Sequence, residues 1–445
     1  MLLVLALAAV VRLAALAVPA APMPDADTYD RMAGGLIERG ELREATGNRA
    51  RVVPGYPLFL AGCRALFGGS DAAWRVPQAL LGAATVLTVF LLARRLFGAR
   101  AAVFAGLLAA LDPFSVYFGT MELTETLGLG LLAWAALLAW RARGGEGDSP
   151  AAGAGFAAGA GLLAGLGLLT RPAVGMIAAM LILGALFLPG AGRPQFKAAL
   201  ARACLALAIF VAALSPWWVR NWQVLGAFVP VSTDGGGSLY EGNSPHATGG
   251  PAIPETTAQR IGELGLVDEL ERNRTLGAEA RAWIASHPGD FARLAAVKFA
   301  RTWSPAPNFA PYRRWYYVLP SVLAWMMVMG LAALGVAAGT RGGGRGAGRK
   351  APITASSPVP RPPSHAPIWF CLLPVLFVAA AHTVWIGSVR YRMPAWPFLE
   401  VLAGAGAAWA YARISHRCTQ MNTDARGGTT TATTDQPQMH ADSRR

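Results

Sequence analysis

Two groups of carboxylates lie beside hydrophobic segments of this chain. Asp25 and Asp27 follow the first hydrophobic segment, and Glu122 and Glu125 open a later one. A charge at a membrane boundary is costly to desolvate, so it persists where it pairs, lines a cavity or takes part in chemistry. A carboxylate can act as a general base that takes the proton of a nucleophile. Because both groups are predicted on one side of the membrane, they indicate an active site on one membrane face.

Basic residues at the predicted outer ends of the hydrophobic segments are candidates for binding a phosphate. Arginine suits this role because its planar guanidinium gives two parallel hydrogen bonds. The alternative is a side chain that extends to the lipid headgroups. The candidates are Arg51, Arg171, Arg220, Arg390, Arg392 and Lys298.

Each acidic candidate also has a purely structural interpretation. Asp25 or Asp27 could cap a helix predicted over residues 28–40, which stabilises a helix by about 1 kcal/mol. Glu125 could orient an acceptor, ligate a metal or pair with a cation, or it could be a carboxylate favoured by the helix dipole. Glu122 is predicted one helical turn earlier, on nearly the same face.

Two further features of the sequence each have two interpretations. Tyr56 follows Pro54 and precedes Pro57, which fix a rigid turn, and it either lines an acceptor cleft or packs in that turn. The glycine-rich segment 234–237 could cover the site or form a flexible hairpin.

The composition predicts an all-α polytopic membrane protein. Of 445 residues, 54% are hydrophobic and 14% are charged, which excludes a disordered chain and argues against an ordinary soluble domain. A helix needs roughly 20 mostly apolar residues to cross a bilayer. About ten stretches are predicted, near residues 2–20, 74–93, 101–119, 122–140, 153–170, 172–190, 198–218, 315–338, 367–387 and 394–412.

The distribution of Lys and Arg in the short loops predicts the orientation. It places both termini in the cytoplasm and residues 21–73 and 219–314 outside. The formal charge of +14 is then explained by the inner loops, and no basic face with aromatic platforms indicates nucleic-acid binding. The predicted division is a catalytic membrane module over 1–218, an outer region over 219–314, further spans over 315–412, and a disordered tail over 413–445. Residues 341–366 are predicted to form a flexible inner loop.

Seven short motifs then give the chain a family resemblance. It resembles the GT-C membrane glycosyltransferases, in the branch of glycosyltransferase family 39 that holds protein O-mannosyltransferases and aminoarabinose transferases. The motifs follow one another in the expected order between residue 1 and about residue 412. They are Asp25-Ala26-Asp27-Thr28-Tyr29, Pro54-Gly55-Tyr56-Pro57-Leu58-Phe59-Leu60-Ala61, Ala93-Arg94-Arg95-Leu96-Phe97-Gly98, Leu123-Thr124-Glu125-Thr126-Leu127, Leu169-Thr170-Arg171-Pro172, Pro216-Trp217-Trp218-Val219-Arg220-Asn221-Trp222 and Arg390-Tyr391-Arg392-Met393-Pro394.

The resemblance implies a GT-C-like helix bundle and an activity. Such enzymes take a sugar from a polyprenyl-phosphate carrier and pass it to a lipid, glycan or protein acceptor on the non-cytoplasmic side. Asp25 matches the acidic residue of the family's first outer loop and is the expected base. Many relatives carry a second acid directly after it, where this chain has Ala26, so Asp27 is the alternate. The implied location is the plasma (inner) membrane.

No cofactor is certain from the sequence. Two carboxylates could hold Mg²⁺ or Mn²⁺, while several relatives work without metal, and the six histidines show no ligand spacing. Three other functions stay open. They are a transporter or lipid flippase, which would place charges in mid-span and repeat its halves, a ligase that uses a diphosphate-linked donor, and a non-catalytic scaffold.

Overall fold

The computed structural model describes residues 1–19, 23–144, 149–189, 194–251, 254–309, 312–342 and 365–427. Within these ranges the chain is helical and contains no strand. The predicted loop 341–366 falls almost entirely outside the described residues, as do residues 428–445 of the predicted tail. The predicted all-α membrane fold is confirmed.

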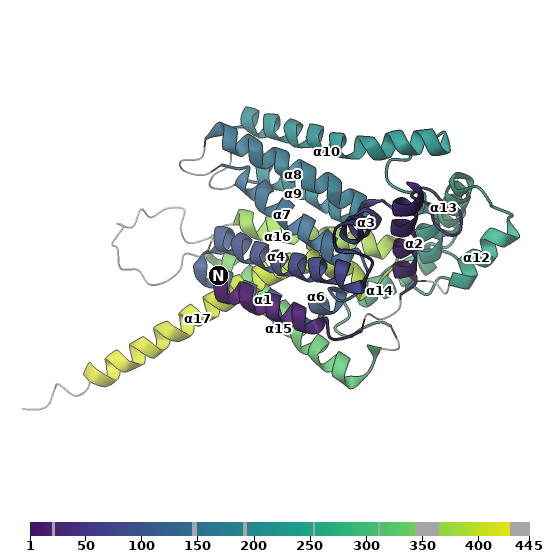
Figure 1. Cartoon of the computed structure of the whole chain (residues 1–445). Coiled ribbons are helices and arrows are strands. Elements are labelled where there is room, and N and C mark those ends of the chain that lie inside the picture. Colours follow the sequence, from purple (N-terminus) through teal and green to yellow (C-terminus); the bar gives the residue numbers. More distant parts are fainter. Residues whose placement is uncertain are drawn as a thin grey trace, which may run out of the picture.

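Ten helices form an elongated bundle (Figure 1). Each coincides with one of the predicted hydrophobic stretches. Their bounds are α1 Leu2–Ala15, α4 Asp71–Phe97, α5 Ala99–Leu111, α7 Glu125–Arg141, α8 Pro150–Thr170, α9 Pro172–Phe187, α10 Phe196–Leu225, α15 Trp315–Gly342, α16 His365–Val384 and α17 Trp396–Gly427.

Shorter helices cover one end of this bundle. In Figure 1, α2, α3, α12, α13 and α14 gather at the end opposite the N-terminus. The two segments predicted to lie outside therefore meet on the same end. The bounds are α2 Pro24–Arg39, α3 Gly55–Phe67, α6 Pro113–Phe118, α11 Gly235–Gly242, α12 Pro254–Glu263, α13 Glu269–Ser286, α14 Pro288–Thr302 and the 3-10 helix η2 Val389–Ala395.

The count of about ten spans is not confirmed. Among the described helices, five are long and apolar enough to cross a bilayer, namely α4, α8, α10, α15 and α16. Helices α1, α5 and α9 are apolar but shorter. The predicted span 101–119 ends early because Asp112 leaves the helical conformation and caps α6, accepting a hydrogen bond from the Ser115 backbone N–H at 2.7 Å. Helix α17 continues past residue 412 into the predicted tail.

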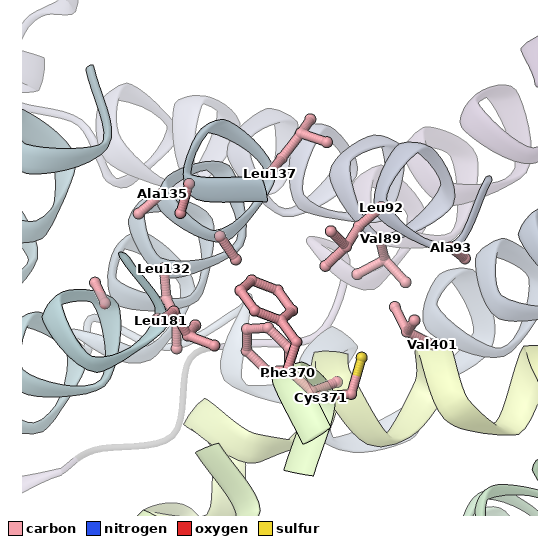
Figure 2. Close-up of a cluster of buried hydrophobic side chains, with 14 of the residues drawn as sticks. Val89, Leu92, Ala93, Leu132, Ala135, Leu137, Leu181, Phe370, Cys371 and Val401 are labelled. Carbon is pink, nitrogen blue, oxygen red and sulfur yellow. The ribbon is translucent and has the colours of Figure 1, made fainter. Parts of the chain in front are cut away.

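The core is built from small and branched apolar side chains. Figure 2 shows Phe370 of α16 between Leu132 and Leu181 on one side and Val89 and Val401 on the other. Close helix contacts depend on glycine. A Cβ at Gly406 of α17 would lie 2.0 Å from the Leu331 carbonyl oxygen of α15, so only glycine allows this crossing. This packing fixes the frame on which the polar end of the bundle is built.

Candidate active site

The Glu125 carboxylate lies at the centre of a buried group of charges. Helix α7 begins at Glu125, whose side chain has 0% exposure. One oxygen accepts a hydrogen bond from Arg171 Nη1 at 2.5 Å, and both oxygens accept from Arg390. Arg171 lies at the junction of α8 and α9, and Arg390 lies in η2. Because a buried charge is tolerated only when it is paired, Glu125 holds three distant parts of the chain together.

Asp25 extends this group to the surface. It lies in the first turn of α2, and its half-exposed carboxylate accepts a hydrogen bond from Arg390 Nη1 at 2.6 Å. Arg390 therefore bridges Asp25 and Glu125. Two carboxylates and two guanidinium groups balance each other, and only Asp25 among them is half exposed. The arrangement presents one accessible carboxylate beside a cation.

Aromatic rings hold the Arg171 side chain in place. The Arg171 guanidinium lies over the ring of Tyr391, 5.3 Å from its centroid. The Tyr391 ring also stacks on His382 of α16, with centroids 4.7 Å apart and planes within 2° of parallel. A cation over an aromatic face is attracted by the ring quadrupole, so Tyr391 helps to orient Arg171.

Gln78 connects the elements that carry the two carboxylates. It is fully buried in α4. Its side-chain oxygen accepts a hydrogen bond from the Tyr56 hydroxyl at 2.8 Å, and its amide donates to the backbone oxygens of Gly119 at 3.0 Å and Met121 at 2.6 Å. The two backbone contacts lie in the segment that leads into α7, so Gln78 fixes the approach to Glu125.

Tyr29 completes the connection to Asp25. It follows Asp25 by one turn of α2, and its ring packs edge-on against Tyr56 with centroids 5.2 Å apart. Burial, and then the nearby Asp25 carboxylate, raise the pKa of Tyr29, which keeps the phenol neutral. Tyr29 and Gln78 were not among the residues predicted for the site. The signal for Gln78 was a polar residue inside an apolar helix, which a membrane protein keeps for a reason.

The structure thus brings Asp25, Glu125, Arg171 and Arg390 together, and separates other predicted site residues from them. Tyr56 has 0% exposure and lies in the first turn of α3, where its ring packs against Tyr29 and Phe59. Its place in an acceptor cleft stays a prediction. Glu122 precedes α7 and does not share its helical face with Glu125. Its nearest basic group is Arg64 at 3.9 Å.

The predicted role of Lys298 and Arg392 as phosphate ligands stays a prediction, and the structure gives both side chains other partners. Both side chains have 0% exposure. Lys298 donates to the Asn243 side-chain oxygen at 2.8 Å and to the Val384 backbone oxygen at 2.9 Å. Arg392 donates to the Ser304 backbone oxygen and lies between the rings of Phe114 and Trp396. They fasten α14 and η2 to the bundle.

Arg220 also forms hydrogen bonds to backbone oxygens of the protein. It donates to the backbone oxygens of Arg49 at 2.6 Å and Leu42 at 2.7 Å, which clamps the first outer segment onto α10. A role in binding phosphate would require it to leave these carbonyls. Arg51 stays a candidate, since its side chain is 37% exposed and contacts Glu44 at 2.9 Å and Asp234 at 3.6 Å.

Two local predictions near the site are wrong. Helix α2 begins at Pro24 rather than at Thr28, because proline suits the first helical position. Neither Asp25 nor Asp27 is therefore its cap, although Gly40 ends it in the left-handed conformation as predicted. Segment 234–237 does not form a hairpin, since its glycines begin α11. Its role as a cover stays a prediction.

Comparison with known proteins agrees with this architecture. The family model of dolichyl-phosphate-mannose-protein mannosyltransferases matches residues 51–219. The apo oligosaccharyltransferase of Archaeoglobus fulgidus is similar in structure with a TM-score of 0.55, at 16% identity over 95% of this chain and 52% of that one. The chain has the GT-C glycosyltransferase fold. The predicted resemblance is thus confirmed at the level of the fold.

Two other solved structures are also similar to this chain. The Archaeoglobus oligosaccharyltransferase in complex with Zn and sulfate has a TM-score of 0.53, at 17% identity over 96% of this chain and 51% of that one. ArnT of Cupriavidus metallidurans bound to undecaprenyl phosphate has a TM-score of 0.48, at 16% identity over 94% of this chain and 63% of that one. The chain therefore spans between half and two thirds of these structures. No curated protein matches it.

The residues of this GT-C site do not fit a divalent cation. Glu125 accepts hydrogen bonds from two arginines and Asp25 from one. A metal ion would have to displace these guanidinium groups, and the described residues contain no cluster of three His, Cys, Asp or Glu side chains that could hold one. The arginines, rather than a metal, supply the positive charge in this arrangement.

Replacing Gln78 with leucine should lower both stability and activity. The change leaves the Tyr56 hydroxyl and the Gly119 backbone oxygen without partners, and removes one of the two donors to the Met121 backbone oxygen. We expect this to destabilise the protein by about 1–3 kcal/mol. Thr88→Val is the matched control, because Thr88 is equally buried in α4 but bonds only within its helix, to the Ala84 backbone oxygen. Thermal unfolding in nanodiscs measures the difference, and equal stability of the two variants would contradict the role assigned to Gln78.

Glu122 should make the stability of the protein depend on pH. It lies in the turn before α7, where burial and then Asp30 raise its pKa from 4.5 to about 7, against the opposing effect of Arg64. Because the folded state favours the protonated form, the stability gained from it is present below pH 4.5 and lost as the pH rises through 7.

Replacing Glu122 with glutamine should therefore stabilise the protein at pH 8 by roughly 1–3 kcal/mol and change little at pH 4.5. Unfolding of the variant and the wild type at both pH values tests this. Glu38→Gln, which removes an exposed carboxylate of α2, is the control. The same difference between Glu122→Gln and wild type at both pH values would contradict the expectation.

Proposed function

We propose that this protein is a membrane glycosyltransferase that moves a glycosyl group from a polyprenyl-phosphate donor to an acceptor on the extracytoplasmic face. The observation that carries the proposal is the accessible Asp25 carboxylate beside Arg390, at one end of a GT-C bundle. The matched family model supports the donor class, because its members use dolichyl-phosphate mannose.

The group of charges has the parts that such a transfer requires. Asp25 takes the proton of the acceptor hydroxyl, and the acceptor oxygen forms a bond to the anomeric carbon. The bond between that carbon and the phosphate oxygen breaks, and the phosphate leaves with the electron pair. Arg390 and Arg171 stabilise the charge on the leaving phosphate. A phosphate leaves without a strong general acid, so one accessible carboxylate is sufficient, and attack opposite the phosphate inverts the anomeric centre.

The sidedness of the reaction follows from the basic loops. Helices of the two segments predicted outside gather at one end of the bundle (Figure 1), and they include α2, which carries Asp25. The loops rich in Lys and Arg are predicted at the other, cytoplasmic end. A site at the outer end would use a donor exposed on the outer leaflet and a lipid, glycan or protein acceptor in that compartment.

A ligase that uses a diphosphate-linked donor is the second candidate. The two similar structures with TM-scores of 0.55 and 0.53 are both oligosaccharyltransferases. The group of two arginines and one accessible acid would also suit a leaving diphosphate. The identity of the donor separates the two functions.

Release of the carrier tests the proposal directly. Purified protein in nanodiscs is supplied with a panel of polyprenyl-phosphate and polyprenyl-diphosphate sugars and a membrane extract as the acceptor source. We expect free polyprenyl phosphate from the wild type, and a loss of about 10²–10⁴-fold in turnover for Asp25→Asn. Asp290→Asn, which removes an exposed carboxylate of α14, should keep the wild-type rate.

The outcomes assign the function. Release from a diphosphate donor alone would establish the ligase instead. Release by Asp25→Asn at the wild-type rate would keep the enzyme class but remove Asp25 as the base. No carrier released from any donor, with extracts from several sources, would contradict the glycosyltransferase.

A further inference from the structure

The three nitrogens of the Arg390 guanidinium have two different kinds of partner. Nε and Nη2 face the fully buried Glu125 carboxylate, with Nη2 at 3.4 Å from Oε2. Nη1 faces outward and donates to Asp25 Oδ2 at 2.6 Å. The Glu125 side chain is 0% exposed and the Asp25 side chain is 50% exposed. One side of Arg390 is thus fixed inside the protein, and the other ends at a position that solvent can reach.

We infer that the carrier phosphate binds at the position on Arg390 Nη1 that the Asp25 carboxylate occupies, and that it thereby releases Asp25 to act as the base. This inference rests on the proposed function. A phosphate oxygen and a carboxylate oxygen accept the same charge-assisted hydrogen bond from a guanidinium. The two anions therefore compete for one donor.

The relative strength of the contacts decides which carboxylate moves. Glu125 accepts hydrogen bonds from two arginines in a buried environment, and removing it would leave those charges unpaired. Asp25 has one arginine partner and is half exposed, where an ion pair contributes little. An incoming phosphate therefore displaces Asp25 and leaves Glu125 in place to hold Arg390.

Displacement of Asp25 by the phosphate sets the order of the steps. Without a donor, Oδ2 of Asp25 accepts the hydrogen bond from Arg390 Nη1. Once the phosphate occupies Nη1, the Asp25 carboxylate can rotate toward the acceptor hydroxyl and take its proton, while the phosphate departs with the electrons of the bond to the anomeric carbon. Donor binding thus frees the Asp25 oxygen that Arg390 holds.

Binding of the product carrier tests this competition without any turnover. The probe is undecaprenyl phosphate, titrated against wild type, Asp25→Asn and Asp27→Asn in nanodiscs of neutral lipid. Asp27 is the matched control, because it is an exposed carboxylate in the same first turn of α2 and none of its described contacts is to an arginine. The competition predicts that Asp25→Asn binds the probe about three- to tenfold more tightly than wild type, while Asp27→Asn binds as wild type does.

Each outcome separates this inference from the proposed function. Equal tightening by Asp25→Asn and Asp27→Asn would overturn displacement, because a general change in charge would explain both. Unchanged or weaker binding by Asp25→Asn would also overturn it, while carrier binding by the wild type would leave the proposed function intact. A wild type that does not bind the probe, with Arg390→Ala no different, would remove the proposed function and the inference together.

Discussion

The buried Glu125 carboxylate is the constraint on which the polar end of this molecule depends. A carboxylate without water persists only with partners that neutralise it. Its partners come from the α8–α9 junction and from η2, which lie 46 and 265 residues away in sequence. Three helical segments must therefore meet at one point before the charge is satisfied. The position of Arg390, and with it the position of Asp25, follows from that requirement.

The other residues of the site fix the positions of Glu125 and its arginine partners. Gln78 in α4 fixes the turn that precedes Glu125, and Tyr391 orients Arg171. Lys298 and Arg392 use their charge to anchor α14 and η2 to backbone oxygens. Most charged residues at this end of the bundle thus hold other helices and side chains in position. Asp25 differs because its carboxylate is half exposed, and this exposure is the reason that it is assigned the chemistry.

The sequence predicted the fold class and the central charges, but not all of their partners. The apolar stretches and the short motifs were sufficient for a GT-C-like bundle, and Asp25, Glu125, Arg171 and Arg390 were all selected. The burial of Lys298 and Arg392 could not be predicted, because burial depends on tertiary packing that a local pattern does not contain. Gln78 was missed for the same reason, since its partners lie 22 and 43 residues away. The start of α2 was misplaced because Pro24 was not considered as the first helical residue.

A double-mutant cycle on Glu125 and Arg390 tests the central claim most directly. The free energy of unfolding is measured for wild type, Glu125→Gln, Arg390→Gln and the double variant. If the two groups neutralise each other inside the protein, each single change should destabilise it by about 3–5 kcal/mol, because it leaves the group of two carboxylates and two guanidinium groups with an unbalanced charge. The double variant should then be more stable than the sum of the single effects predicts, by about 1.5 kcal/mol or more. Effects that add within about 0.5 kcal/mol would show that the two side chains act independently, and would contradict this account of the site.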